Sequence, residues 1–146
     1  MTAVIVGIGQ PAGGDDGVGL AVARALAARG FETRESADAS IVLALLATER
    51  RVVLVDAVVG GGVPGAVVRI TAEALGSGPQ PLSSHGLGVA EAIELASTLY
   101  GAAIAARVEI VGVAIARPTG AAFGLSPAVA AAVEPAAALA ASLAGA

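Results

Sequence analysis

Three groups of residues in this chain carry side chains that could do chemistry. The first is a glycine-rich stretch, residues 7–19, in which the glycines are interrupted by Asp15 and Asp16. The second is Asp56, which directly follows a run of four apolar residues, and the third is His85, the only histidine. Because the chain contains no cysteine, thiolate metal sites, cysteine nucleophiles and disulfides are excluded.

The glycine-rich stretch has an alternative interpretation as a dinucleotide-binding turn. That fingerprint, Gly-x-Gly-x-x-Gly, needs a glycine where this chain has Ala12. A pyrophosphate would also sit at the N-terminus of the following helix, where Asp15 and Asp16 would repel it and attract a cation. A simpler alternative is that the two carboxylates only interact with the helix dipole, which is worth a few tenths of a kcal/mol each, as a rough figure.

Asp56 and His85 also have simple structural interpretations when each is taken alone. An aspartate at the end of a strand often caps a turn through its own backbone. A single histidine in a loop is most often solvated or caps a neighbouring backbone group. Their positions relative to the predicted strands and helices are therefore more informative than their types.

The elements that would position these residues alternate between strand and helix. Short apolar runs bounded by glycine or charged residues predict strands, and apolar residues at helical spacing predict helices. Ser126 followed by Pro127 is a good start for the last helix, which we expect to break or kink near Pro135. The alternation predicts a single α/β domain over 1–146, a three-layer sandwich around a mostly parallel sheet. Strands are expected at 3–9, 31–37, 51–57, 66–70 and 107–114, and helices at 18–29, 40–49, 87–100 and 126–143.

In that arrangement Asp16, Asp56 and His85 follow strand ends or lie in loops that lead into a helix. The carboxyl ends of neighbouring parallel strands share one edge of the sheet, where α/β proteins place their binding sites. We therefore expect the three side chains to converge on one shallow, solvent-accessible cleft. Two carboxylates and one imidazole leave coordination positions open, which suits a divalent ion such as Ni²⁺ or Zn²⁺ that must bind something else as well.

Composition and charge narrow the possible partners. All eight basic residues are arginine and they are scattered, and only 2% of the residues are aromatic, so the usual footprint of nucleic-acid binding is missing. The net charge is −4, and 56% of the residues are apolar, which excludes disorder. Charged residues and prolines interrupt the apolar runs before they reach the roughly 20 residues of a membrane span. The N-terminus lacks a basic signal-peptide region, so a soluble cytoplasmic protein is expected.

The sequence resembles the hydrogenase maturation proteases, nickel-dependent endopeptidases that trim the C-terminus of the large subunit of NiFe hydrogenases. The resemblance runs nearly from end to end. The motifs that carry it are Gly7-Ile8-Gly9, Gly14-Asp15-Asp16-Gly17-Val18-Gly19, Val55-Asp56-Ala57, Gly61-Gly62-Val63-Pro64-Gly65, Ser84-His85-Gly86-Leu87, Val111-Gly112-Val113 and Gly124-Leu125-Ser126-Pro127.

The resemblance implies a three-layer α/β/α sandwich of the phosphorylase/hydrolase-like kind around a twisted sheet. It matches Asp16, Asp56 and His85 to the metal-contacting positions of the family, with Ni²⁺ supplied by the substrate, a hydrogenase large-subunit precursor. Asp16 is also expected to take part in catalysis, with Asp15 or Asp38 as the carboxylate base that assists water attack. The glycines that flank these residues, Gly14, Gly17 and Gly86, are expected to bind substrate.

The chain departs from the family pattern at three places. Gln10 stands where the family usually has asparagine, and Ala114 where it often has glutamate or glutamine. The loop that usually reads Asp-Gly-Gly-Thr is Ala37-Asp38-Ala39-Ser40 here, which matches Asp38 only with a shift of one residue. The altered loop favours an alternative function, a non-catalytic metal-sensing or chaperone-like relative that binds the precursor. A nucleotide-binding Rossmann-like module is the third alternative.

Overall fold

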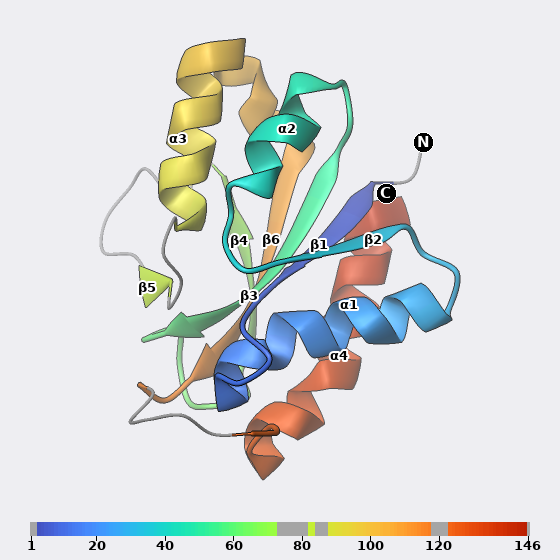
Figure 1. Cartoon of the computed structure of the whole chain (residues 1–146), viewed down its shortest axis with the longest axis vertical. Helices are drawn as coiled ribbons and strands as arrows, with labels where there is room; N and C mark the ends of the chain where they lie inside the picture. The colour runs from blue at the N-terminus through green and yellow to red at the C-terminus, as the bar shows by residue number, and fades with distance from the viewer. Residues whose placement is uncertain (1–2, 73–81, 84–87, 118–122, 146) are drawn as a thin grey trace.

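The computed structural model describes residues 3–72, 82–83, 88–117 and 123–145. Strands and helices follow one another in the predicted order, with one short strand, β5 (Leu82–Ser83), that the sequence did not predict (Figure 1). The strands are β1 (Val4–Ile8), β2 (Thr33–Ser36), β3 (Val52–Val59), β4 (Val67–Thr71), β5 (Leu82–Ser83) and β6 (Val108–Ile115). The helices are α1 (Val18–Ala28), α2 (Ile41–Ala47), α3 (Val89–Tyr100) and α4 (Pro127–Gly145), with shorter 3₁₀ turns η1 (Gly14–Gly17) and η3 (Ala102–Arg107).

The strands form one mixed sheet in the order β2-β1-β3-β6-β4. The pairs of β1 with β2, β1 with β3 and β3 with β6 are parallel, whereas β4 runs antiparallel to β6 at the edge. The short β5 pairs antiparallel with the last two residues of β3. β1 is wholly buried, and β3 and β6 nearly so, as expected for central parallel strands covered on both faces, which explains why they read as continuous apolar runs.

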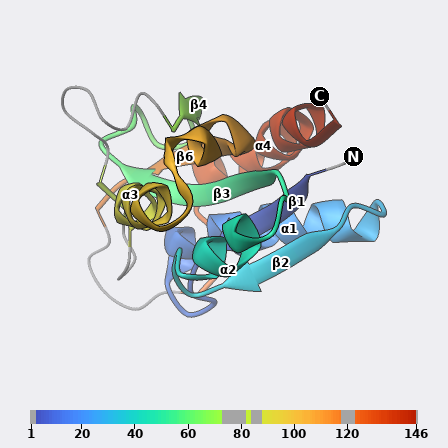
Figure 2. The same cartoon turned by 90° about the horizontal axis from the view of Figure 1, so that it is seen from above.

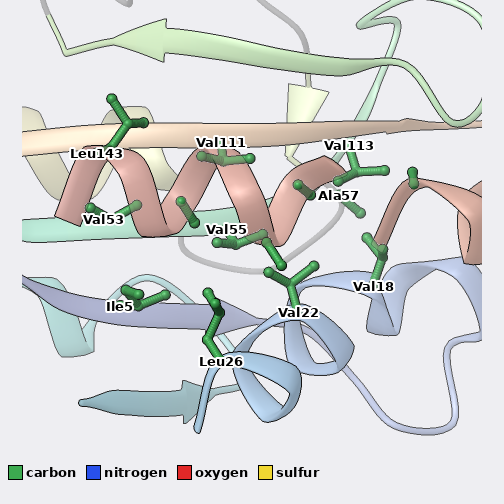
Figure 3. Packing of buried hydrophobic residues seen from close by; sticks show 14 of the residues in the cluster. Ile5, Val18, Val22, Leu26, Val53, Val55, Ala57, Val111, Val113 and Leu143 are labelled. Atoms are coloured by element: carbon green, nitrogen blue, oxygen red, sulfur yellow. The ribbon is translucent and has the colours of Figure 1, made fainter. Parts of the chain in front are cut away.

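Helices cover both faces of this sheet, so the predicted three-layer α/β/α sandwich is confirmed (Figure 2). On one face α1 and α4 pack together over Ile5, Val53, Val55 and Val111, as the close view in Figure 3 shows. On the other face α2 and α3 cover the side chains that alternate with these, among them Leu54. Asp56, two residues after Leu54, therefore falls on the α2 and α3 face of β3.

The last helix differs from the expectation. A break or kink was expected near Pro135, and the break is absent, because α4 is continuous from Pro127 to Gly145. Its buried residues belong to the core cluster shared with α1, and this packing holds the helix together across the proline.

α4 is also the one helix of the described residues that is long and apolar enough to cross a membrane, by length and composition alone. The length of the uninterrupted apolar runs does not indicate such a helix, because Glu134 and Pro135 divide its apolar residues. Of its most apolar window, 39% is buried inside the structure. Its buried side chains line the core on the sheet, and they are Val129, Ala132, Ala136, Ala137, Ala140, Leu143 and Ala144.

Candidate functional site

The candidate site lies at the edge of the sheet where β1, β2 and β3 end. The register pairs Gly7 of β1 with Val55 of β3, so the loop after β1 begins beside the position of Asp56. That loop contains η1, which carries Asp15 and Asp16 and packs against β3. The loop that carries Asp38 begins where β2 ends, at the same edge, because Gly9 donates its backbone hydrogen to the Ser36 carbonyl at 3.0 Å. Strand pairing therefore brings Asp56 and the loops that carry Asp15, Asp16 and Asp38, four of the predicted site carboxylates, to one edge of the sheet.

Asp56 is the one charged residue buried in the described part of the chain. It is only 1% exposed, although we expected a solvent-accessible cleft. That part of the expectation is wrong for Asp56, because β3 is covered on both faces at this position; the strand continues to Val59, two residues beyond the expected end at residue 57. An ionised carboxylate at such a position loses its hydration, which costs several kcal/mol, as an order of magnitude, unless other groups compensate.

Asp16 is held by close packing with glycines of its own loop. A Cβ atom added to Gly13 would lie 2.8 Å from the Asp16 Cβ, and one added to Gly9 would lie 2.6 Å from the Asp16 backbone oxygen. The Asp16 amide donates a hydrogen bond to the Gly13 carbonyl at 3.2 Å. Its carboxylate oxygen Oδ1 is buried and accepts no hydrogen bond from the described residues. A buried oxygen without a hydrogen-bond partner lowers the stability of the fold unless a bound ligand or ion interacts with it.

Asp15, the neighbour of Asp16, contacts the opposite end of the chain. Its Oδ1 accepts a hydrogen bond from the backbone N–H of Ser126 at 2.7 Å, and its Oδ2 accepts one from the Ser126 hydroxyl at 2.8 Å. Ser126 directly precedes α4, and its carbonyl accepts the N–H of Ala130 at 2.8 Å. Asp15 thus joins η1 to the start of α4, which the sequence analysis did not foresee.

Asp38 lies in the turn between β2 and α2. Its Oδ1 accepts the backbone N–H of Ser40 at 2.9 Å, a local hydrogen bond that shapes the turn into α2. A second, longer contact at 3.4 Å joins the Asp38 amide to the Ser36 hydroxyl. These two contacts give Asp38 a local structural role in the turn that leads into α2.

His85 and Gly86 lie outside the described residues, so the structure does not test the complete triad. In the described ranges no group of three histidine, aspartate or glutamate side chains is arranged to hold a metal. The chain on either side of His85 is described: Ser83 pairs with Val58 of β3, and α3 begins at Val89. Of the two glycines expected to bind substrate that are described, Gly14 is buried in η1 and Gly17 is partly exposed.

The residues that sequence reasoning missed are those that position the site. Gly19 in α1 packs on the strands: a Cβ atom there would lie 2.4 Å from the Val55 oxygen and 2.5 Å from the Ile8 oxygen. The glycine-rich pattern was a signal for such close backbone contact. Ser126 gave no comparable signal as a partner of Asp15, because the two are 111 residues apart.

Comparison with known proteins places this architecture in a family. A model of the hydrogenase maturation protease family matches residues 37–143. The NiFe hydrogenase maturation protease HybD from Thermococcus kodakarensis superposes with a TM-score of 0.80 at 28% identity, over 99% of each chain. HycI from Thermococcus kodakarensis KOD1 gives 0.73 at 24% identity, over 99% of this chain and 93% of that one. The HybD endopeptidase from E. coli gives 0.70 at 21%, over 95% and 89%.

The likenesses to HycI and to the E. coli protein, both under 25% identity, bear on the fold alone. No curated protein matches the chain in sequence. The family model covers most of the chain, including the Asp38 loop, Asp56 and His85. This chain belongs to the hydrogenase maturation protease family, whose members are endopeptidases.

Proposed function

We propose that this protein removes the C-terminal extension of a NiFe hydrogenase large-subunit precursor, and that it recognises the nickel already bound to that precursor. Nickel is thus part of the substrate and is contacted by Asp16, Asp56 and His85. The proposal would make cleavage conditional on nickel loading, because a precursor without the metal would lack the group that these side chains bind.

The observation that carries the proposal is the placement of Asp16 and Asp56 at one sheet edge. Asp16 Oδ1 is buried and accepts no hydrogen bond from the described residues. A bound cation would compensate for that missing hydrogen bond. Carboxylate oxygens with an imidazole are a suitable donor set for a divalent transition ion. The residues present therefore fit the metal.

The neighbourhood of His85 is consistent with a third ligand at the same edge. Ser83, two residues before His85, is paired with Val58, two residues after Asp56. The pairing of β5 with the end of β3 thus places the backbone just before His85 beside the backbone just after Asp56. This proximity supports His85 as a partner of Asp56.

The reaction is hydrolysis of one peptide bond. The C–N bond breaks, the carbonyl carbon gains the hydroxyl of a water molecule, and the amine of the released extension gains a proton. A metal-bound carbonyl would be polarised for this attack, and a carboxylate would take the proton from water. We assign the base to Asp38 because its loop begins where β2 ends, at the edge of the sheet that carries Asp56. Asp15 is instead held to Ser126 through both of its carboxylate oxygens.

Intact-mass spectrometry of the precursor tests the proposal. With the nickel-loaded precursor we expect two products whose masses sum to that of the precursor plus one water, and with the nickel-free precursor we expect no cleavage. Cleavage of both forms alike would contradict nickel recognition. An intact precursor that nevertheless stays bound to this protein would identify the non-catalytic, precursor-binding alternative that the Ala37–Ser40 loop suggests.

The variant Asp38→Asn separates binding from chemistry in the same assay. If Asp38 is the base, the variant retains capture of the nickel-loaded precursor and loses cleavage, typically by 10²-fold or more, as an order of magnitude. Parental cleavage by this variant would exclude Asp38 as the base.

A further inference from the structure

We propose that Ser126 is a positioning residue for the metal-contacting carboxylate of Asp16, acting through Asp15. The contact between Asp15 and Ser126, called the clasp below, would fix η1 against the start of α4 and so set the direction of the Asp16 side chain. The inference rests on the proposed function in one respect: Asp16 is taken to contact the metal.

The clasp uses every hydrogen-bonding atom that the two side chains offer. The two Asp15 oxygens are occupied separately, at 2.7 Å by the Ser126 N–H and at 2.8 Å by its hydroxyl. The Ser126 N–H belongs to the residue that starts α4, where the first backbone donors have no partner within the helix. In a capping box a carboxylate three residues along the same helix supplies this acceptor, whereas here it comes from a distant loop. Charged acceptors make such hydrogen bonds stronger than neutral ones.

Because Asp15 and Asp16 are neighbours in η1, the contact of Asp15 with Ser126 also sets the direction in which the Asp16 side chain points. A 3₁₀ turn has three residues per turn, so consecutive side chains point about 120° apart. Holding Asp15 toward α4 therefore turns Asp16 away from α4. The start of α1 and the start of α4 lie side by side in Figure 1, as the two hydrogen bonds require.

The rest of η1 leaves Asp16 little freedom once the clasp is closed. On one side Gly13 approaches so closely that a Cβ there would lie 2.8 Å from the Asp16 Cβ. On the other side Gly19 lies against the carbonyls of Val55 and Ile8, which fixes the start of α1 on the sheet. The clasp is the third support and the only one of the three made by side chains. Loss of a group that orients a metal ligand typically weakens metal binding 10- to 100-fold, as a rough range.

Hydrogen exchange and nickel titration of three variants test the proposal. Ser126→Ala removes the hydroxyl, Ser126→Thr keeps it, and Asp15→Ala removes both hydrogen bonds. We expect Ser126→Ala to speed amide exchange in residues 13–17 and to weaken binding of nickel chloride about tenfold. Ser126→Thr should restore both values. Asp15→Ala should be at least as severe, and adding Ser126→Ala to it should cause no further loss, because the partner is already gone.

A matched control breaks a different contact with α4, one made from the far end of α1. Arg29 at the end of α1 forms an ion pair with Glu134 of α4, far along the helix from η1. Glu134→Ala should leave exchange in residues 13–17 and nickel binding unchanged. If Ser126→Ala likewise changes neither, the clasp does not position Asp16 and the inference is wrong. It is also wrong if Asp15→Ala lowers precursor cleavage while amide exchange in residues 13–17 and nickel binding stay unchanged, since Asp15 would then act on the substrate itself.

A further variant separates failure of this inference from failure of the proposed function. Asp16→Ala should abolish nickel binding if Asp16 is a ligand. If it does not, the ligand assignment fails, while the exchange measurement still shows whether the clasp orders η1. If Asp16→Ala abolishes nickel binding and Ser126→Ala leaves it intact, the proposed function stands and the positioning role falls.

Discussion

Gly19 of α1 packs directly on the backbone of Val55 in β3, the residue before Asp56. A Cβ atom on Gly19 would lie 2.4 Å from the Val55 carbonyl oxygen, well inside van der Waals contact. The absence of a side chain at Gly19 therefore determines how closely α1, and with it Asp16, approaches the strand that carries Asp56.

Gly19→Ala tests this relationship. The added methyl group should push α1 away from the strands and lower the free energy of unfolding by about 1–3 kcal/mol, the usual cost of overpacking. Precursor cleavage should fall as well, because Asp16 moves with the helix. Thermal unfolding followed by circular dichroism measures the first effect and the mass assay measures the second.

Gly145→Ala is the control, because nothing lies within 4 Å of the position where its Cβ would be. It should leave the unfolding midpoint unchanged or slightly raised, since alanine favours a helix over glycine. If Gly19→Ala is as stable as Gly145→Ala, the close packing of α1 on β3 is not required.

Asp56→Asn should separate stability from activity. The amide is close to the carboxylate in size and shape, so the variant should keep the native fold although the side chain is only 1% exposed. An amide is a poorer ligand for a divalent ion, so cleavage of the nickel-loaded precursor should be lost. Urea unfolding and the mass assay measure the two quantities.

Glu109→Gln provides a matched acid-to-amide change on the neighbouring strand β6, where Glu109 pairs with Arg69 at 2.7 Å. It should cost no more than about 1 kcal/mol and keep the cleavage rate. Asp56 would be a structural residue if Asp56→Asn unfolded the protein, and it would not be a ligand if the variant cleaved at the parental rate.

Glu32, which precedes β2, should add a pH-dependent contribution to stability that is separate from the candidate site. The hydrogen bond from Arg50 holds the pKa of Glu32 below its ordinary value, assisted by the charge of Arg34. A depressed pKa stabilises the fold above the unfolded-state value, roughly 4.3, and this stabilisation is lost as the pH falls through the folded-state value. The stability difference between the parent and Glu32→Gln should therefore be present at pH 7 and shrink below about pH 4. Urea titrations at the two pH values measure it, and an unchanged difference would contradict the assignment.

The central strands β1, β3 and β6 were predictable because buried parallel strands are apolar along most of their length. The sequence predicts a strand over residues 51–57, and β3 runs from Val52 to Val59. The outcome at Pro135 was not predictable from local sequence, because tertiary packing of the apolar face, rather than the proline, decides whether α4 continues.

For the site, the sequence indicated which residues to examine but not their surroundings. Strand ends predicted that Asp16 and Asp56 share an edge of the sheet, since that follows from parallel pairing alone. The burial of Asp56 depends on what covers β3, and the clasp between Asp15 and Ser126 joins residues 111 positions apart. Neither the burial of Asp56 nor the contact between Asp15 and Ser126 produces a pattern in the sequence from which it could be predicted.

The most direct test of the central claim is the rate at which His85→Ala cleaves the nickel-loaded precursor, compared with the parent and with Ser84→Ala. Imidazole is the only nitrogen ligand of the proposed triad, so its loss should abolish cleavage while Ser84→Ala remains active. A circular dichroism melt of each variant should show an unchanged fold, with a stability difference within about 0.5 kcal/mol. Cleavage by His85→Ala at the parental rate would contradict nickel recognition by this triad, and an unfolded His85→Ala would show that His85 is structural.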